Sequence, residues 1–311
     1  MMDTRGVRAP TFLAMVAVGV AGVCLAMAQT APSWDRAVAR AAHATPDARI
    51  VVLDIGSGHL LAASHLGEAS RTLAAPGSTL KPLVLYGLVA VWRWDPGRRI
   101  ACTRKLAIAG RSLNCSHPAG GPMDAREALT WSCNTYFADV GGTLAPGELR
   151  RLLEPTGLLT QTGLAGGVND GEAVANFRDP QTPDQERLAV LGVDGIAVTP
   201  LELAVAYRWL AVQLGAHADS AAAQVVSTGL ADSASFGMAG AASLGGVPVA
   251  GKTGTASPAT GLQTHGWFVG LAPAEEPRVV IVVYLPAGRG ADAARVGGEV
   301  LRNSPMGKAK P

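Results

Sequence analysis

The order of apolar patterns along this chain predicts an α+β fold whose antiparallel sheet is built from both ends of the chain, with a helical lobe between them and helices on both faces. Two strand-like runs lie near the N-terminus and three lie near the C-terminus, whereas the apolar residues between them follow helical spacing. With 311 residues, of which 48% are hydrophobic and 16% charged, the chain can form one large domain, or two close lobes, around a substantial core.

The N-terminal residues have the composition of an export signal. Arg5 and Arg8 precede an apolar run over residues 12–28, and Ala26-Met27-Ala28 has the small-x-small pattern of a cleavage site. The length of the run lies between those of a signal peptide and a membrane anchor. We therefore expect residues 1–28 to direct export to the periplasm or the extracytoplasmic face of the membrane, with the chain either anchored by the apolar run or released after Ala28.

The first two strands are predicted to form a hairpin. After a polar linker over residues 29–47, residues 49–54 form one strand-like run and residues 59–64 form another. Gly56-Ser57-Gly58 supplies the turn between them.

A nucleophile and a base are predicted at the start of the next helix. Ala75-Pro76-Gly77 breaks the chain and residues 80–92 follow with helical spacing, so Ser78 lies at a helix N-terminus with Lys81 on the same face. Lys81 is one of only five lysines among 26 basic residues, and arginine cannot serve as a base because it does not lose its proton. If burial lowers the pKa of Lys81, its neutral amine can take the proton of Ser78, which indicates acyl transfer.

The helical lobe is predicted over residues 98–213. A short helix over residues 124–129 ends at Trp131-Ser132-Cys133-Asn134, and another helix begins at Thr135. A clearer helix start is Thr199-Pro200-Leu201-Glu202, where Thr199 is the N-cap and Glu202 completes a capping box before an apolar run.

The cysteines are interpreted in the light of export. Cys102 and Cys115 flank an Arg-rich, loop-like segment, and in an oxidising compartment we expect a disulfide between them. Cys133 is left over and is interpreted as a small buried apolar side chain.

The sequence predicts no metal, no cofactor and no nucleic-acid partner. The formal net charge is +2, and no basic stripe interleaved with aromatic residues is visible. His265 lies near a predicted site strand. The other histidines lack metal-ligand spacing and are interpreted as ordinary surface or core residues: His43, His59, His65, His117 and His217.

The C-terminal third returns to strands, over residues 247–256, 265–271 and 278–285, before a closing helix over residues 292–302. The first of these strands contains Lys252-Thr253-Gly254-Thr255. Gly254 leaves room for a ligand to approach the strand backbone, Thr253 and Thr255 offer hydroxyl groups, and Lys252 offers a fixed positive charge.

In this order, Ser-x-x-Lys, Ser-x-Asn and Lys-Thr-Gly resemble the motif set of the penicillin-recognising serine acyltransferases. The local sequences resemble the transpeptidase domain of penicillin-binding proteins, especially the class B type. They include Ala75 to Pro82, Ser132 to Phe137, Val198 to Ala204, Gly251 to Ala256 and Gly266 to Pro273. The resemblance implies a β-lactamase/transpeptidase-like fold over residues 48–304, with a tail over residues 305–311.

The resemblance also implies a reaction on D-alanyl-D-alanine stem peptides of peptidoglycan. Ser78 would form the acyl-enzyme and Lys81 would act as base. Ser132 would relay a proton and Asn134 would hold Lys81 and the substrate amide. Lys252, Thr253, Gly254 and Thr255 would form the substrate-binding strand, and the N–H groups of Ser78 and Thr255 would form the oxyanion hole. β-Lactams would be covalent inhibitors, and cell-wall synthesis proteins are possible partners.

Three alternatives stay open. A D,D-carboxypeptidase would share the same acyl-enzyme and use water as the acceptor. A serine β-lactamase would need a deacylating residue, and Glu172-Ala173-Val174-Ala175-Asn176 has a superficially suitable pattern, although its surroundings favour a structural role. A β-lactam-sensing domain would be acylated without turnover.

The segment Gly192-Val193-Asp194-Gly195 stands where many relatives have Gly-Gln-Gly.

Overall fold

The structure is a computed structural model that describes residues 32–91, 93–118, 120–166, 171–257 and 263–308. Residues 1–31, which include the predicted export segment over residues 1–28, lie outside the described part. Within the described ranges, no helix combines the length and the apolar character needed to span a bilayer.

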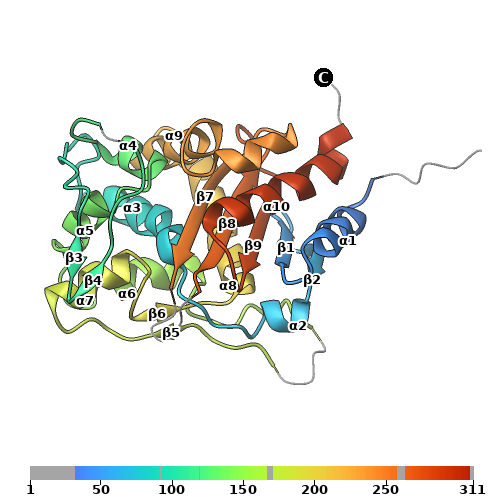
Figure 1. The fold of residues 1–311 in the computed structure, drawn as a ribbon, viewed down its shortest axis with the longest axis horizontal. Helices are drawn as coiled ribbons and strands as arrows, with labels where there is room; N and C mark the ends of the chain where they lie inside the picture. The colour runs from blue at the N-terminus through green and yellow to red at the C-terminus, as the bar shows by residue number, and fades with distance from the viewer. Residues whose placement is uncertain (1–31, 92, 119, 167–170, 258–262, 309–311) are drawn as a thin grey trace, which may run out of the picture. The chain divides into compact units, whose positions relative to one another are not determined.

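A single five-stranded antiparallel sheet joins the two ends of the domain, as the sequence predicts (Figure 1). Its strand order is β2-β1-β9-β8-β7, and every neighbouring pair is antiparallel. The strands are β1 (Arg49–Asp54), β2 (Leu60–Ser64), β7 (Ala250–Ala256), β8 (His265–Ala272) and β9 (Val279–Leu285). The predicted α+β fold class is confirmed.

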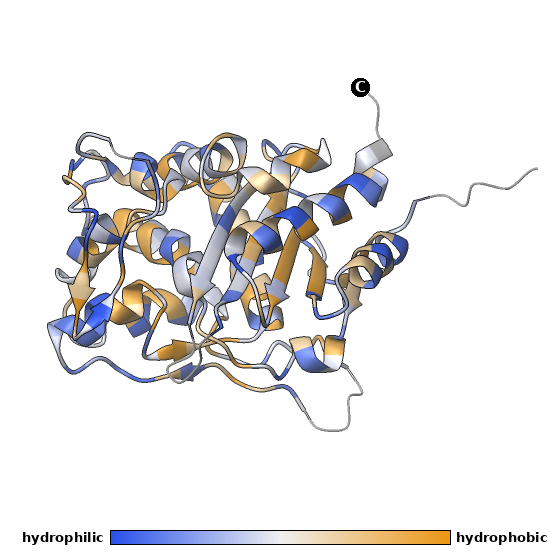
Figure 2. Ribbon diagram, in the orientation of Figure 1, coloured by the Kyte–Doolittle hydropathy of each residue, from blue (hydrophilic) through white to orange (hydrophobic). Residues whose placement is uncertain are grey.

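Both faces of the sheet are buried, which explains why its central strands are apolar almost throughout (Figure 2). Because successive side chains of a strand point to opposite faces, Ile50 and Val52 enter one core and Val51 and Leu53 enter the other. Helices α1 (Trp34–Ala44) and α10 (Gly290–Asn303) belong to the first core, and α8 (Pro200–Ala216) packs against β1 and β9 from the other side (Figure 1).

The sequence predicts a polar linker over residues 29–47, but the structure has helix α1 in this segment, which corrects the prediction. Ser33 caps the helix by accepting a hydrogen bond from the backbone N–H of Arg36, and Ala37, Val38 and Ala41 are buried. Their small side chains let α1 pack closely against α10. The arginines of this segment make it polar in composition, but they lie outside this buried stripe. At the other end, Met306 packs against the same core, so the predicted tail is also partly in contact with the domain.

In the sequence, the remaining helices lie between the two groups of strands, and most of them form a lobe to one side of the sheet (Figure 1). They are α2 (Leu66–Ala69), α3 (Lys81–Ala90), α4 (Ala125–Thr130), α5 (Asn134–Gly141), α6 (Glu148–Leu153), α7 (Pro183–Val190) and α9 (Ala221–Ser235). Short 3-10 turns are η1 (Gly77–Leu80), η2 (Glu154–Thr156), η3 (Gly240–Gly245) and η4 (Pro305–Lys308). Two-residue strands pair as β3 (Ala107–Ile108) with β4 (Arg111–Ser112), and as β5 (Asn176–Phe177) with β6 (Ile196–Ala197).

The lobe is less helical than the sequence predicts. The described residues between α3 and α4, and those between η2 and α7, run mostly as loops with the short strands β3, β4 and β5. The capping box at the start of α8 is confirmed, because Thr199 accepts from the N–H of Glu202 while the Glu202 carboxylate accepts from the N–H of Thr199.

Candidate active site

Ser78 lies in the 3-10 turn η1, directly before α3, and is partly exposed. The turn is fixed on several sides. The Gly77 N–H donates to the Gly192 carbonyl at 2.8 Å, and the Tyr207 hydroxyl donates to the Thr79 carbonyl at 2.7 Å. Because Gly77 has a φ of 54°, the residue before Ser78 occupies a conformation that favours glycine.

Strand β8 supports the chain just before this turn. The Ala75 carbonyl accepts hydrogen bonds from Trp267 Nε1 at 2.9 Å and from His265 Nε2 at 3.0 Å. Burial lowers the pKa of His265, so its neutral ring can donate this hydrogen bond without a buried charge. His265 therefore has a structural contact with the segment that carries Ser78.

Gly254 brings β7 against the same segment. A Cβ at Gly254 would lie 2.5 Å from the Pro76 carbonyl oxygen, so the space that the sequence assigns to a ligand is occupied by the chain itself. A Cβ at Gly77 would lie 3.3 Å from the backbone nitrogen of Thr255. These close approaches place the end of β7 beside the turn that carries Ser78.

Lys81 lies one helical turn after Ser78 and is completely buried, at 0% exposure. Its Nζ donates to Asn134 Oδ1 at 2.7 Å, to the Ser132 carbonyl at 2.9 Å and to Ser132 Oγ at 3.4 Å. Burial lowers the pKa of Lys81 to about 8, so an appreciable fraction of its amine is neutral near neutral pH.

Lys252 reaches the same hydroxyl from β7. Its Nζ donates to Ser132 Oγ at 2.8 Å, and it is also 0% exposed. Burial, and then the charge of Lys81, lower the pKa of Lys252. Among the described residues, no carboxylate forms an ion pair with either lysine. Burial and the charge of Lys81 thus disfavour the positive charge that the sequence analysis assigns to Lys252, and an anion in the site would favour it.

Ser132 occupies the short loop between α4 and α5, with a φ of 56° that a serine rarely adopts. Such a residue persists only where the surrounding structure holds it. This conformation directs both its carbonyl and its hydroxyl towards Lys81.

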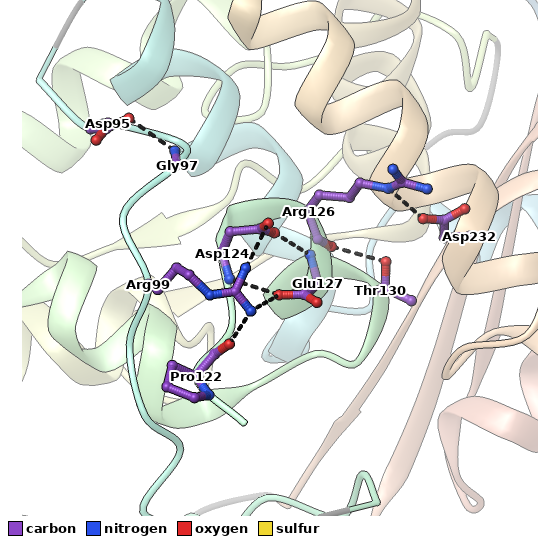
Figure 3. A network of polar contacts seen from close by, with 9 residues as sticks. All are labelled: Asp95, Gly97, Arg99, Pro122, Asp124, Arg126, Glu127, Thr130 and Asp232. Carbon is purple, nitrogen blue, oxygen red and sulfur yellow. Dashed lines mark hydrogen bonds and ion pairs between the residues drawn. The ribbon is translucent and has the colours of Figure 1, made fainter. Parts of the chain in front are cut away.

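A polar network holds α4 in place ahead of this loop (Figure 3). The Asp124 carboxylate caps α4 by accepting from the N–H of Glu127 at 2.9 Å, and Arg99 lies between both carboxylates. On the α9 side, Arg126 Nε contacts Asp232 at 2.6 Å (Figure 3). The last residue of α4, Thr130, is thus fixed two positions before Ser132.

Asn134 links Lys81 to the loop between α3 and α4. While its Oδ1 accepts from Lys81, its Nδ2 donates to the Leu113 carbonyl at 3.0 Å. Both contacts fix the orientation of the amide, which therefore presents its acceptor to the lysine.

A cleft of about 580 Å³ opens beside these groups. Its walls include Arg111, Leu113, Asn134, Val193, Thr255 and Ser257. Thr255 is exposed towards this cleft and its Oγ1 accepts from the Gly290 N–H at 2.9 Å. Thr253 is buried, and its hydroxyl is directed to the Met238 carbonyl at 3.4 Å. The two threonine hydroxyls of the predicted substrate-binding strand therefore differ, and of the two only Thr255 lines the cleft.

The predicted disulfide between Cys102 and Cys115 is absent from the structure, where both are free thiols together with Cys133. Cys115 Sγ lies 3.9 Å from Cys133 Sγ, and Cys102 Sγ lies 3.4 Å from His117 Nε2. All three sulfurs and the His117 ring instead converge, with their ligand atoms within 4.8 Å of one another. The hydrogen bond from Cys133 lowers the pKa of Cys115, while the same bond and burial raise the pKa of Cys133.

Glu172 has a structural role. Its carboxylate accepts from the N–H groups of Thr162, Gly163 and Ala165, at 2.6 to 3.0 Å. Burial alone would raise the pKa of Glu172, but these hydrogen bonds lower it overall. Since its oxygens accept hydrogen bonds within its own loop, Glu172 is not available as the deacylating residue that the superficial pattern with Asn176 suggests.

The comparisons with known proteins agree with this geometry. The family model described as the penicillin binding protein transpeptidase domain matches residues 48–304, so the chain belongs to this family. The chain is similar to the peptidoglycan D,D-transpeptidase PbpA of Mycobacterium tuberculosis, with 24% identity over 75% of the chain and 53% of the relative. The corresponding Mycolicibacterium smegmatis protein is 26% identical over 78% of the chain and 55% of the relative. The chain thus spans about half the length of these relatives.

Solved structures share the fold. The transpeptidase domain of Burkholderia pseudomallei penicillin-binding protein 3 superposes with a TM-score of 0.74 at 20% identity, covering 90% of this chain and 97% of the other. Pseudomonas aeruginosa PBP2 in complex with WCK 5153 gives a TM-score of 0.72 at 22% identity, covering 86% and 75%.

Sequence reasoning missed several residues that position the site. A Cβ at Gly192, which has a φ of 67°, would lie 2.3 Å from the Gly77 carbonyl oxygen, so this glycine is required beside the nucleophile. The segment Gly192-Val193-Asp194-Gly195, which departs from the Gly-Gln-Gly of many relatives, was the feature of the sequence that could have indicated this role. Tyr207 and Trp267 make long-range hydrogen bonds that no local pattern indicates.

Proposed function

We propose that this chain is a D,D-transpeptidase-like serine acyltransferase that acts on the D-alanyl-D-alanine stem peptides of peptidoglycan through an acyl-enzyme on Ser78. The observation that carries the proposal is the buried Lys81, which has no carboxylate partner in the described part of the chain and is held by Ser132 and Asn134 one turn from Ser78. Family membership supports the same reaction class.

In the first half-reaction, Ser78 Oγ attacks the carbonyl carbon of the penultimate D-alanine and its proton passes to neutral Lys81. The N–H groups of Ser78 and Thr255 stabilise the resulting oxyanion, an interaction worth about 3 kcal/mol per donor. The proximity of Gly77 to the Thr255 nitrogen supports this pair. The peptide C–N bond then breaks, and the leaving amine receives a proton through Ser132.

Ser132 suits this relay because its hydroxyl lies between two buried amines. Lys81 Nζ is 3.4 Å from Ser132 Oγ and Lys252 Nζ is 2.8 Å from it. Arrival of the substrate carboxylate near Thr255 would stabilise the charged form of Lys252, because an opposite charge raises the pKa of a lysine. Substrate binding would thereby favour the neutral form of Lys81 and prepare it as a base.

In the second half-reaction, an amine from another stem peptide attacks the acyl carbon and gives a proton to Lys81. The C–O bond to Ser78 then breaks as Lys81 returns this proton to Ser78 Oγ, which restores the free enzyme. A second hollow of about 310 Å³, lined by Arg178, Asp194 and His265, shares Val193 and Ser257 with the first cleft. Because the two hollows meet at these residues, they support a reaction in which the donor stem peptide enters from one hollow and the acceptor stem peptide from the other.

The fate of the acyl group distinguishes the related activities. The exported domain is incubated with a fluorescent penicillin and a chromogenic cephalosporin, with Ser78→Ala as the control. Durable labelling that the variant loses supports the proposal, rapid cephalosporin turnover favours a β-lactamase, and absence of wild-type acylation contradicts both. A stem-peptide assay with and without an acceptor amine then separates cross-linking from carboxypeptidase trimming; a chain that acylates without any turnover is a sensing domain.

The site of action follows from the substrate. Peptidoglycan is cross-linked outside the cytoplasm, so we propose that the chain acts at the extracytoplasmic face of the membrane, either anchored by residues 12–28 or released after Ala28. The apolar run and the Ala26-Met27-Ala28 pattern support export. Other cell-wall synthesis proteins are the proposed partners.

A further inference from the structure

Four metal-binding side chains converge beside the candidate active site. Cys102, Cys115 and His117 come from the loop between α3 and α4, and Cys133 is the residue that precedes α5. Their ligand atoms all lie within 4.8 Å of one another. Cys115, His117 and Cys133 are buried, and Cys102 is partly buried.

Two of the spacings between these atoms are those of a tetrahedral zinc site, and the remaining ones are at most 4.8 Å. With Zn–S bonds of about 2.3 Å and Zn–N bonds of about 2.0–2.1 Å, tetrahedral geometry separates two sulfurs by about 3.8 Å and a sulfur from a nitrogen by about 3.5 Å. The structure has 3.9 Å between the sulfurs of Cys115 and Cys133, and 3.4 Å between Cys102 Sγ and His117 Nε2. A disulfide would require the sulfurs to approach to about 2.05 Å.

The histidine is oriented as a metal ligand. Its Nδ1 lies 2.7 Å from the Pro118 carbonyl oxygen, so Nδ1 carries the proton and donates it there. The lone pair is consequently on Nε2, the atom that faces Cys102. A hydrogen bond from the second ring nitrogen to a carbonyl is the usual support of a metal-bound histidine.

Backbone donors support the sulfurs. The N–H of Asn134 donates to Cys115 Sγ at 3.2 Å, and the N–H of Arg104 donates to Cys102 Sγ at 3.4 Å. Such bonds stabilise the thiolate form, which is the form that binds a metal.

We propose that Cys102, Cys115, His117 and Cys133 bind one Zn²⁺ in a closed, structural site. Binding displaces the thiol protons to solvent as the three Zn–S bonds and one Zn–N bond form. Four protein ligands leave no open position for catalysis. The ion ties the loop between α3 and α4 to the start of α5, and so fixes Asn134, whose N–H and amide both contact that loop. The proposal differs from the sequence-based expectation that the chain binds no metal and that His117 is an ordinary surface or core residue.

The test measures metal in the full chain, independently of enzyme activity. The wild type, purified without chelators and with its thiols reduced, is expected to hold about one zinc per chain, and Co²⁺ loaded in its place should give the absorption of a tetrahedral cobalt thiolate. His117→Ala and Cys115→Ser are expected to lower the zinc content at least about fivefold. His217→Ala is the matched control, because His217 is exposed outside the cluster and should leave the content unchanged.

Two results would overturn the proposal. One is a reduced, folded wild type that takes up less than about a tenth of an equivalent of zinc and shows no tetrahedral cobalt spectrum. The other is a disulfide among Cys102, Cys115 and Cys133 in the natively exported protein, shown by mass spectrometry of unreduced peptides. Because both readouts use the wild type, they decide the question even if a variant fails to fold.

Discussion

Two lysines that share one serine hydroxyl define the chemistry of the site. Lys81 and Lys252 are both buried and both donate to Ser132 Oγ, without a carboxylate partner among the described residues. Each of two buried ammonium groups lowers the pKa of the other when they lie this close. The site therefore favours one charged and one neutral lysine over two charged ones. An entering anion then decides which lysine is charged.

The pH dependence of acylation tests the role of Lys81. Only neutral Lys81 can accept the proton of Ser78, and its pKa is lowered to about 8. The second-order rate of penicillin acylation should therefore rise with pH through about 8, and should fall about tenfold per pH unit well below that value. Stopped-flow labelling between pH 5.5 and 9.5 measures this, with circular dichroism to verify folding at each pH. A flat profile would contradict the assignment of Lys81 as base.

The position of the turn η1 depends on contacts from several distant elements of the fold. It is held by β7 through the close approach at Gly254, by β8 through Ala75, and by the Gly192 loop. A 3-10 turn of four residues has little stability of its own, so the contacts from these distant elements place Ser78.

Substitution of Gly192 should damage acylation without touching a reacting group. In Gly192→Ala, the new Cβ would clash with the Gly77 carbonyl, and a φ of 67° is strained for alanine. We expect a loss of about 2–4 kcal/mol of unfolding free energy and at least about a tenfold slower acylation in the fraction that remains folded. Urea unfolding and penicillin labelling measure the two effects.

Gly215→Ala is the matched control for that substitution. Gly215 lies in α8 with no atom within 4 Å of a Cβ, so alanine should leave acylation unchanged and stabilise the helix by about 0.5–1 kcal/mol. Equal acylation rates in both variants would show that η1 does not depend on the Gly192 contact.

The described domain as a whole is a sheet between two cores, and its candidate site gathers residues from three distant parts of the chain. Ser78 follows the N-terminal hairpin, Ser132 belongs to the helical lobe and Lys252 lies in a C-terminal strand. The sheet order, in which β1 pairs with β9, brings these parts together. The site therefore forms only when both ends of the domain have paired.

Removal of α1 tests whether the domain begins before residue 48. Deleting residues 34–44 exposes the core surface that Ala37, Val38 and Ala41 cover. Burial of these side chains is worth about 3 kcal/mol, so the melting temperature should fall by about 6–12 °C. Differential scanning calorimetry measures the shift; an unchanged melting temperature would restore the interpretation of this segment as a linker.

The sequence was informative where the pattern is local and less so where distant residues meet. Apolar runs and the capping box at Thr199 predicted the sheet and the start of α8. The motif order predicted the side chains that gather around Ser132, namely Lys81, Asn134 and Lys252. Helices α1 and α9 are rich in alanine, which carries a weak apolar signal, so they were missed. The convergence of Cys102 with Cys133 depends on the path of a mostly irregular loop, which no periodicity describes.

The most direct test is to locate the acyl bond. The wild type is treated with benzylpenicillin, digested and sequenced by mass spectrometry, alongside Ser78→Ala. We predict one penicilloyl group per chain, attached to Ser78, and none on the variant. An adduct on another residue, or equal labelling of the variant, would contradict the assignment of Ser78 as the nucleophile.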